Sequence, residues 1–145
     1  MGIALNEDLS QISLIFIYAA MAVYTASFLT FANHLSRLAS EKKKIRGAAT
    51  KIERIAIILM IIAAVLHGVG VLLRGIAASR VPWANMYEFS ITGSFVVVAI
   101  FLFALAIKDI RLIATFVSGF TLLILGSATA VFYVEVKSLM PALQS

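Results

Sequence analysis

Six residues near the middle of this sequence carry side chains that could bind a ligand within an otherwise apolar chain. They are His67, Arg74, Arg80, Trp83, Tyr87 and Glu88. An imidazole can coordinate a metal ion, and arginine binds carboxylates with parallel hydrogen bonds. Tryptophan and tyrosine rings offer flat surfaces that suit the boundary between lipid and water. The stretch 67–94, which holds them, is therefore the part of the chain most informative about function.

Hydrophobic helices must position these residues. The chain is 62% hydrophobic and only 13% charged, whereas soluble proteins carry about 25% charged residues. Four apolar stretches without Lys, Arg, Asp, Glu or Pro lie at about 12–32, 55–73, 89–107 and 112–134. Each is near the ~20 residues that cross a hydrocarbon core of ~30 Å. We therefore expect an all-α, polytopic membrane protein with four transmembrane helices, in which residues 1–145 form a single domain.

The distribution of basic residues predicts the orientation. The loop at 33–54 and the short turn after the third stretch hold nine of them, whereas the opposite side holds three, Arg74, Arg80 and Lys137. The positive-inside rule then places the loop 33–54 in the cytoplasm, and the loop 74–88 and both chain ends outside. Membrane topology thus explains the net charge of +5, and we expect no nucleic-acid partner. The basic loop could also bind anionic lipid or a cytoplasmic partner.

The segment around Pro82 predicts a helix start. Pro82 disfavours helix at the preceding residue. Asn85 is a good N-cap, and Glu88 follows three positions later, as in a capping box. The third helix would then begin at Met86, with Glu88 in its first turn, where the helix dipole favours negative charge. This structural role accounts for Pro82, Asn85 and Glu88 without any ligand.

His67 lies within the second apolar stretch. It shares a helical face with Gly70, Val71 and Arg74, and Gly68 and Gly70 leave room beside it for another helix or a planar ligand. Ionisable residues within a span are candidates for function. The alternative is a neutral histidine that forms a hydrogen bond to a neighbouring helix. His34, at the end of the first span, is interpreted as an interfacial residue.

Several kinds of chemistry have no support in the sequence. There is no cysteine, which excludes disulfides, thiolate metal sites and a cysteine nucleophile. The chain has no Gly-rich phosphate loop, no paired carboxylates and no Ser-His-Asp arrangement. We therefore predict no catalytic residue and no metal-ion site.

Two segments resemble the cytochrome c assembly family. LHGVGVLLRG at 66–75 followed by RVPWANMYEFSITGS at 80–94 is similar to the CcsA/ResC-type membrane subunit of the system II cytochrome c synthase, called CcsB in actinobacteria. In that family, a PW-N-YE segment follows the second span and opens the third. The terminal LMPALQS at 139–145 resembles a family segment that precedes a helix with an external haem-binding histidine.

The resemblance implies a role in cytochrome c biogenesis. With a ResB-like partner, such subunits bring b-type haem across the membrane and hold it outside for attachment to apocytochrome c. The expected location is the bacterial plasma membrane, or the thylakoid membrane if the protein is plastid. On this reading, Arg74, Arg80, Trp83 and Tyr87 would contact haem in transit, with the arginines pairing with its propionates. A haem contact by His67 is a further prediction, which rests on its burial and its neighbours rather than on the resemblance. The alternative for both arginines is contact with headgroup phosphates.

The family pattern is incomplete in this chain. Family members hold haem on a tryptophan-rich WWD segment between two external histidines, but Trp83 is the only tryptophan here. We therefore expect the chain to be the N-terminal portion of a longer protein, and no family haem-ligand histidine can be carried over. Whether the chain belongs to an enzyme complex, the haem lyase, depends on those missing parts.

Two other functions remain open. A non-catalytic membrane scaffold that docks a ResB-like partner would need no haem site of its own. A small four-helix transporter is the third hypothesis, but proton-coupled carriers normally place a carboxylate within a span, and none of the four stretches contains one.

Overall fold

The protein is a bundle of four long helices. The computed structural model describes residues 2–41 and 51–133. The helices are α1 (Gly2–Glu41), α2 (Lys51–Ala78), α3 (Met86–Ile107) and α4 (Ala114–Ser127); the 3-10 turn η1 (Arg111–Ile113) leads into α4, and the π-helical turn η2 (Ala128–Phe132) follows it. The described residues contain no strand. The all-α prediction with four spanning helices is thus confirmed.

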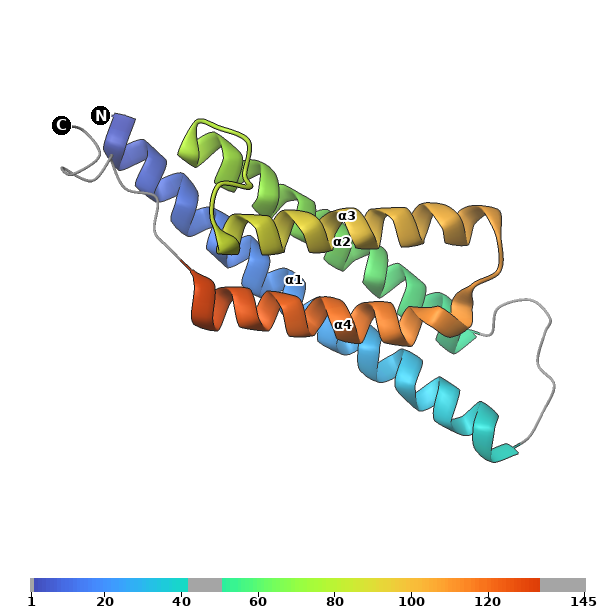
Figure 1. Ribbon diagram of the computed structural model, residues 1–145. Coiled ribbons are helices and arrows are strands. Elements are labelled where there is room, and N and C mark those ends of the chain that lie inside the picture. The colour runs from blue at the N-terminus through green and yellow to red at the C-terminus, as the bar shows by residue number, and fades with distance from the viewer. Residues whose placement is uncertain (1, 42–50, 134–145) are drawn as a thin grey trace.

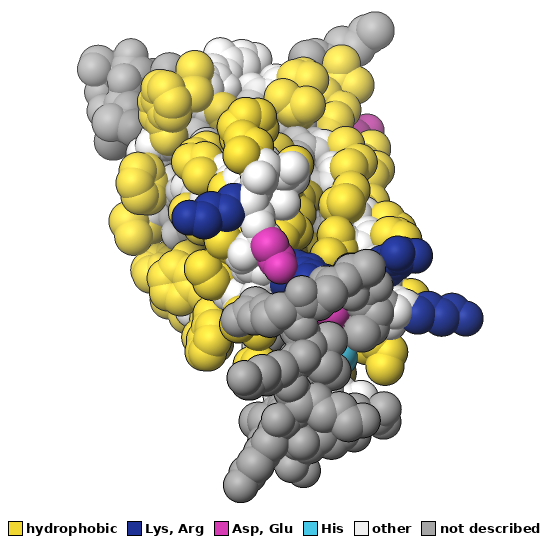
Figure 2. Space-filling model, turned by 90° about the vertical axis from the view of Figure 1, so that its right-hand side faces the viewer, with side chains coloured by type: hydrophobic (Ala, Val, Ile, Leu, Met, Phe, Trp, Pro, Cys, Tyr) yellow, Lys and Arg dark blue, Asp and Glu magenta, His cyan; other side chains and the backbone are white. Residues whose placement is uncertain are grey.

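The four helices are long and apolar enough to cross a membrane, over residues 7–36, 51–78, 86–107 and 111–132. Figure 2 views the end of the bundle at which the α3–α4 turn lies; hydrophobic side chains cover the flanks, and charged side chains gather at this end. An apolar flank with charge at the end is the pattern expected of a chain surrounded by lipid. The protein is therefore a multi-pass membrane protein.

The helices extend beyond the apolar stretches on both sides of the predicted basic loop. α1 continues to Glu41 and α2 begins at Lys51, because a helix satisfies its own backbone hydrogen bonds and need not end where hydropathy falls. Residues 42–50 of this loop lie outside the described residues, as do Lys137 and the segment 139–145. On the other side, α2 runs to Ala78, so Arg74 belongs to the helix rather than to the predicted loop 74–88.

α1 and α2 pack along much of their length and cross behind α3 and α4 (Figure 1). The buried residues of α1 recur every three or four positions and are mostly small or polar: Ser10, Ser13, Ile17, Ala20, Tyr24, Ser27, Phe31 and His34. Ser13 Oγ donates to the Gly70 carbonyl at 2.6 Å, and a Cβ on Gly70 would lie 2.7 Å from the Ile17 side chain. Small residues thus allow close helix contact, and hydroxyl groups join the helices.

Candidate functional site

The connection between α2 and α3 folds back over the end of α2. Ser79 has a left-handed backbone, with φ of 56°, and its N–H donates to the Ile76 carbonyl at 3.1 Å. The Arg80 N–H donates to the Gly75 carbonyl at 3.2 Å. These two bonds form a Schellman motif, which satisfies carbonyls at a helix end. A Cβ on Gly75 would approach Pro82 Cδ to 3.2 Å and the Arg80 carbonyl oxygen to 3.3 Å, so glycine allows the loop to lie close to the helix.

α3 begins as the sequence predicts. The side chain of Asn85 caps the helix by accepting from the Glu88 N–H at 2.8 Å. A capping box would also send the Glu88 carboxylate back to the Asn85 N–H. Instead, Glu88 Oε1 accepts from the Ala84 N–H at 3.3 Å, and Oε2 accepts from Asn85 Nδ2 at 3.0 Å. The cap is therefore confirmed, while the carboxylate serves a larger network.

Glu88 is the centre of this network and is fully buried. Its Oε2 accepts from Arg74 Nε and Nη2 at 3.1 and 3.0 Å, and from Arg80 Nη2 at 2.8 Å. Arg74 Nη1 also donates to Ser10 Oγ on α1 at 3.3 Å. A buried carboxylate is costly unless it is paired. The network meets that need and joins α1, α2, α3 and the loop.

Two tyrosines enclose the Arg74 guanidinium. Its central carbon lies 5.0 Å from the ring centre of Tyr87 and 5.7 Å from that of Tyr133. The two rings meet edge to face at 4.9 Å. Tyr133 directly follows the π-helical turn η2. Cation–π contacts of this kind add to the ion pair, so the end of α4 is also tied to Arg74.

The predicted site residues therefore divide into two groups. Arg74 and Tyr87 are buried, so neither is presented on the surface. Trp83 is 63% exposed, and the Arg80 side chain is 45% exposed. The structure brings Arg74, Arg80, Tyr87 and Glu88 together, but only Trp83 and Arg80 face outward. Pro82 helps to hold the loop, because its carbonyl accepts from Thr92 Oγ1 at 2.6 Å.

His67 lies deeper in the bundle, and both of its ring nitrogens have partners. Nε2 lies 2.8 Å from the Ile91 carbonyl on α3, and Nδ1 lies 3.0 Å from the Tyr24 hydroxyl on α1. Since a carbonyl can only accept, Nε2 donates to Ile91; in the neutral form with its proton on Nε2, Nδ1 accepts from the Tyr24 hydroxyl. Both ring nitrogens are thus engaged within the bundle. The geometry fits the alternative interpretation of a histidine that joins helices.

Side chains of neighbouring helices fill the space beside His67. The face predicted for α2 is confirmed, since His67, Gly70, Val71 and Arg74 are all buried. The ring of Phe95 meets the imidazole edge to face at 5.5 Å. A Cβ on Gly68 would lie 2.8 Å from this Phe95 ring. The small residues therefore serve helix packing.

A second charged cluster lies at the opposite end of the bundle. Glu53 on α2 lies 3.3 Å from Arg111 Nη1 and 3.4 Å from His34 Nε2, each measured to Glu53 Oε1. The His34 contact lacks hydrogen-bond geometry. Arg111 also pairs with the neighbouring Asp109 at 2.8 Å. His34 thus contacts α2 at this end of the bundle, and its place at the membrane interface stays a prediction. Among the described residues, no three His, Asp or Glu side chains are grouped to hold a metal ion.

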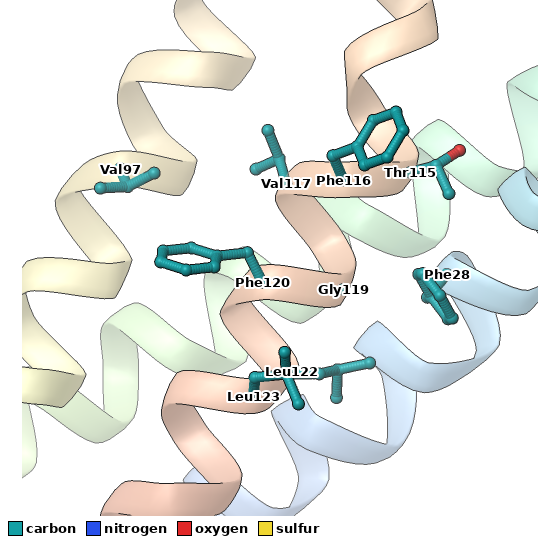
Figure 3. Close-up of a pocket in the computed structure, with 9 residues that line it drawn as sticks. All are labelled: Phe28, Val97, Thr115, Phe116, Val117, Gly119, Phe120, Leu122 and Leu123. Atoms are coloured by element: carbon teal, nitrogen blue, oxygen red, sulfur yellow. The ribbon is translucent and has the colours of Figure 1, made fainter.

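An apolar groove opens on the flank of the bundle, with a volume of about 810 Å³. Figure 3 shows Phe120 of α4 pointing toward α3 and Val97, while Phe28 on α1 lies on the other side of α4. A Cβ on Gly119 would lie 2.8 Å from the Phe28 ring, so glycine allows this close contact. The lining is almost wholly apolar, which suits hydrocarbon.

Sequence reasoning did not identify Ser10, Tyr24 or Tyr133 as partners of the candidate site. A signal was present for the first two. Polar and small residues recur along α1 at the spacing of one helical face, which is typical of helix contacts in membranes. Tyr133 had no such signal, because the π-helical turn that precedes it is not encoded in a simple pattern.

Comparison with known proteins adds no assignment. The chain matches no protein-family model, and it has no significant match among curated proteins or solved structures. The resemblance to the cytochrome c assembly family therefore stays a prediction that rests on its motif residues.

Proposed function

We propose that this chain is the haem-handling membrane subunit of a cytochrome c synthase. With a ResB-like partner, it would present haem outside the membrane for attachment to apocytochrome c. The bacterial plasma membrane, or a thylakoid membrane in a plastid, would be its location. The basic end of the bundle would face the cytoplasm, with both chain ends outside, as the positive-inside rule predicts.

One observation supports the proposal most directly. The exposed Trp83 and the half-exposed Arg80 stand on a loop held in place by the buried Arg74–Glu88 pair. Trp83 supplies a flat ring, and Arg80 supplies a donor for a propionate. Trp83 belongs to the segment that resembles the family's PW-N-YE motif, and Arg80 lies two residues before that segment. His67 is already bonded through both nitrogens. Iron ligation would then come from outside the described residues.

The test uses the complete protein purified together with its ResB-like partner. We expect Trp83→Ala to lower the haem content, measured from the Soret absorbance per protein, by about two- to tenfold, as for loss of one aromatic contact. Phe103→Ala is the matched control, because Phe103 is an exposed aromatic near the other end of α3. Unchanged haem in Trp83→Ala, or equal loss in both variants, would reject the proposal.

Orientation is tested separately. Fusions of alkaline phosphatase and green fluorescent protein after Ala84 report which side of the membrane the loop occupies. Phosphatase activity is expected. Fluorescence without phosphatase activity would place the loop in the cytosol, where haem could not meet an external acceptor, and would end the haem assignment while leaving the membrane assignment intact.

A scaffold that docks the ResB-like partner is the second candidate. The engagement of both His67 nitrogens favours it, since the imidazole at the centre of the bundle then has a structural role. Stable co-purification with the partner and no Soret band, in cells supplied with haem, would support the scaffold over the haem subunit.

A further inference from the structure

Arg80 makes little use of its hydrogen-bonding capacity within the protein. Among the described residues it forms one side-chain hydrogen bond, from Nη2 to Glu88 Oε2 at 2.8 Å. A guanidinium has five N–H donors in a fixed plane. Since the Arg80 side chain is 45% exposed, its other donors are available to a ligand.

Glu88 does not depend on Arg80. The same Oε2 accepts two hydrogen bonds from Arg74 and one from Asn85. With the bond from Arg80, four hydrogen bonds converge on Oε2, although a carboxylate oxygen has only two lone pairs. Among these donors, the Arg80 side chain is the outermost. Arg80 can therefore turn toward another anion without leaving the buried carboxylate unpaired.

The surroundings of Arg80 indicate where that anion lies. Arg80 follows the end of α2, and three of its neighbours along the loop and at the start of α3 are large, apolar and exposed: Val81, Trp83 and Met86. Exposed tryptophan beside arginine at the end of a span is typical of the headgroup layer of a bilayer. An anion at this depth has apolar surface beside it, as a phosphate on a lipid does.

The loop favours an acidic lipid over a zwitterionic one. The connection 79–85 contains no Asp or Glu, and the nearby Glu88 is fully buried. The cationic group of a zwitterionic headgroup therefore has no exposed carboxylate on this loop to pair with. An acidic headgroup has no cationic group and needs no such partner.

We propose that Arg80 forms a phosphate-binding subsite for the headgroup of an acidic phospholipid, with Trp83 packed against the attached glycerol and acyl chain. The Arg80–Glu88 pair is the resting state of this subsite. The proposal does not rest on the haem function, because it needs neither haem nor a partner subunit.

The chain carries its own reporter, since Trp83 is the only tryptophan. The protein is placed in bilayers that contain either phosphatidylglycerol or phosphatidylcholine with brominated acyl chains, which quench nearby tryptophan fluorescence. We expect half-maximal quenching at about fivefold lower mole fraction of the acidic lipid, the preference expected for one arginine at a membrane surface. Equal quenching by the two lipids, with no response to soluble phosphate, would overturn the proposal.

Two substitutions assign the preference to Arg80. Arg80→Gln should remove it, and Arg80→Lys should keep part of it. The matched control is Arg54→Gln, because Arg54 is exposed at the opposite end of α2, and it should leave the preference unchanged. If the preference survives in Arg80→Gln, or falls equally in Arg54→Gln, then the membrane surface charge acts without a subsite and the proposal fails.

A separate experiment distinguishes free phosphate from the phosphate of a lipid headgroup. Inorganic phosphate is added to the protein in phosphatidylcholine bilayers, and Trp83 fluorescence is recorded. A chloride salt at the same ionic strength is the control. A saturable response that Arg80→Gln abolishes identifies free phosphate as a ligand of the same subsite. A lipid preference without this response identifies the lipid headgroup as the source.

Discussion

Each end of the bundle places a glutamate between basic side chains, arginine or histidine, from different elements, yet the two glutamates differ in their surroundings. Glu88 is fully buried, and Arg74, which pairs with it, is also buried. Glu53 retains slight exposure, and its contacts to Arg111 and His34 are longer, at 3.3 and 3.4 Å. Arg111 divides its donors between Glu53 and the half-exposed Asp109.

The difference teaches which end is rigid. A buried, multiply bonded pair cannot exchange partners with water, and its rupture leaves an uncompensated charge. An ion pair near the surface is screened and can be replaced by water at little cost. The Arg74–Glu88 end therefore holds the loop with Trp83 in one position, whereas the Glu53 end links helices more loosely.

The largest expected effect is at the rigid end. Glu88→Gln should lower the free energy of unfolding by about 3–5 kcal/mol, because it removes one member of a buried, hydrogen-bonded ion pair. Thermal unfolding followed by far-ultraviolet circular dichroism in one detergent measures this. A loss below about 1 kcal/mol would show that water reaches Arg74, and the contrast between the ends would disappear.

His67 lies between the two ends, and its substitution should have the second-largest effect on the free energy of unfolding. His67→Phe removes both imidazole hydrogen bonds and leaves the buried Tyr24 hydroxyl without its acceptor, which should cost about 1–3 kcal/mol. Tyr24→Phe is the control, since it removes one of the two bonds and should cost less. The same unfolding measurement applies, and an equal cost for both variants would contradict the two-sided geometry.

The cap of α3 should rank third. Asn85→Ala removes the acceptor for the Glu88 N–H and one donor to Glu88 Oε2, at an expected cost of about 1 kcal/mol. Asn85→Asp retains the capping acceptor and should keep most of the helix start, but it adds a negative charge beside Glu88. Greater protection from hydrogen exchange at the first turn of α3 in Asn85→Asp than in Asn85→Ala would show that the stability loss comes from the lost cap. Equal protection would show that it comes from the lost side-chain amide.

The smallest effect is expected at the other end. Glu53→Gln should cost under about 1 kcal/mol, because Arg111 keeps its pair with Asp109. If Glu53→Gln is as costly as Glu88→Gln, the two ends are equally rigid.

The spans were predictable because their signal is local. A stretch of about 20 apolar residues can satisfy its backbone only as a helix in lipid. The start of α3 at Met86 followed from Pro82, Asn85 and Glu88, since an N-cap acts over three residues. The shared face of His67, Gly70, Val71 and Arg74 followed from helical periodicity.

The partners of these residues were decided by tertiary structure. Arg74 meets Glu88 across 14 positions and Ser10 across 64, and His67 meets Tyr24 across 43. The sequence placed Arg74, Arg80, Trp83 and Tyr87 near one end of the bundle, but it did not separate the buried pair from the exposed one. Whether a side chain at the end of a helix turns inward depends on which helix lies beside it, and that is set by packing along the whole length of α1, α2 and α3.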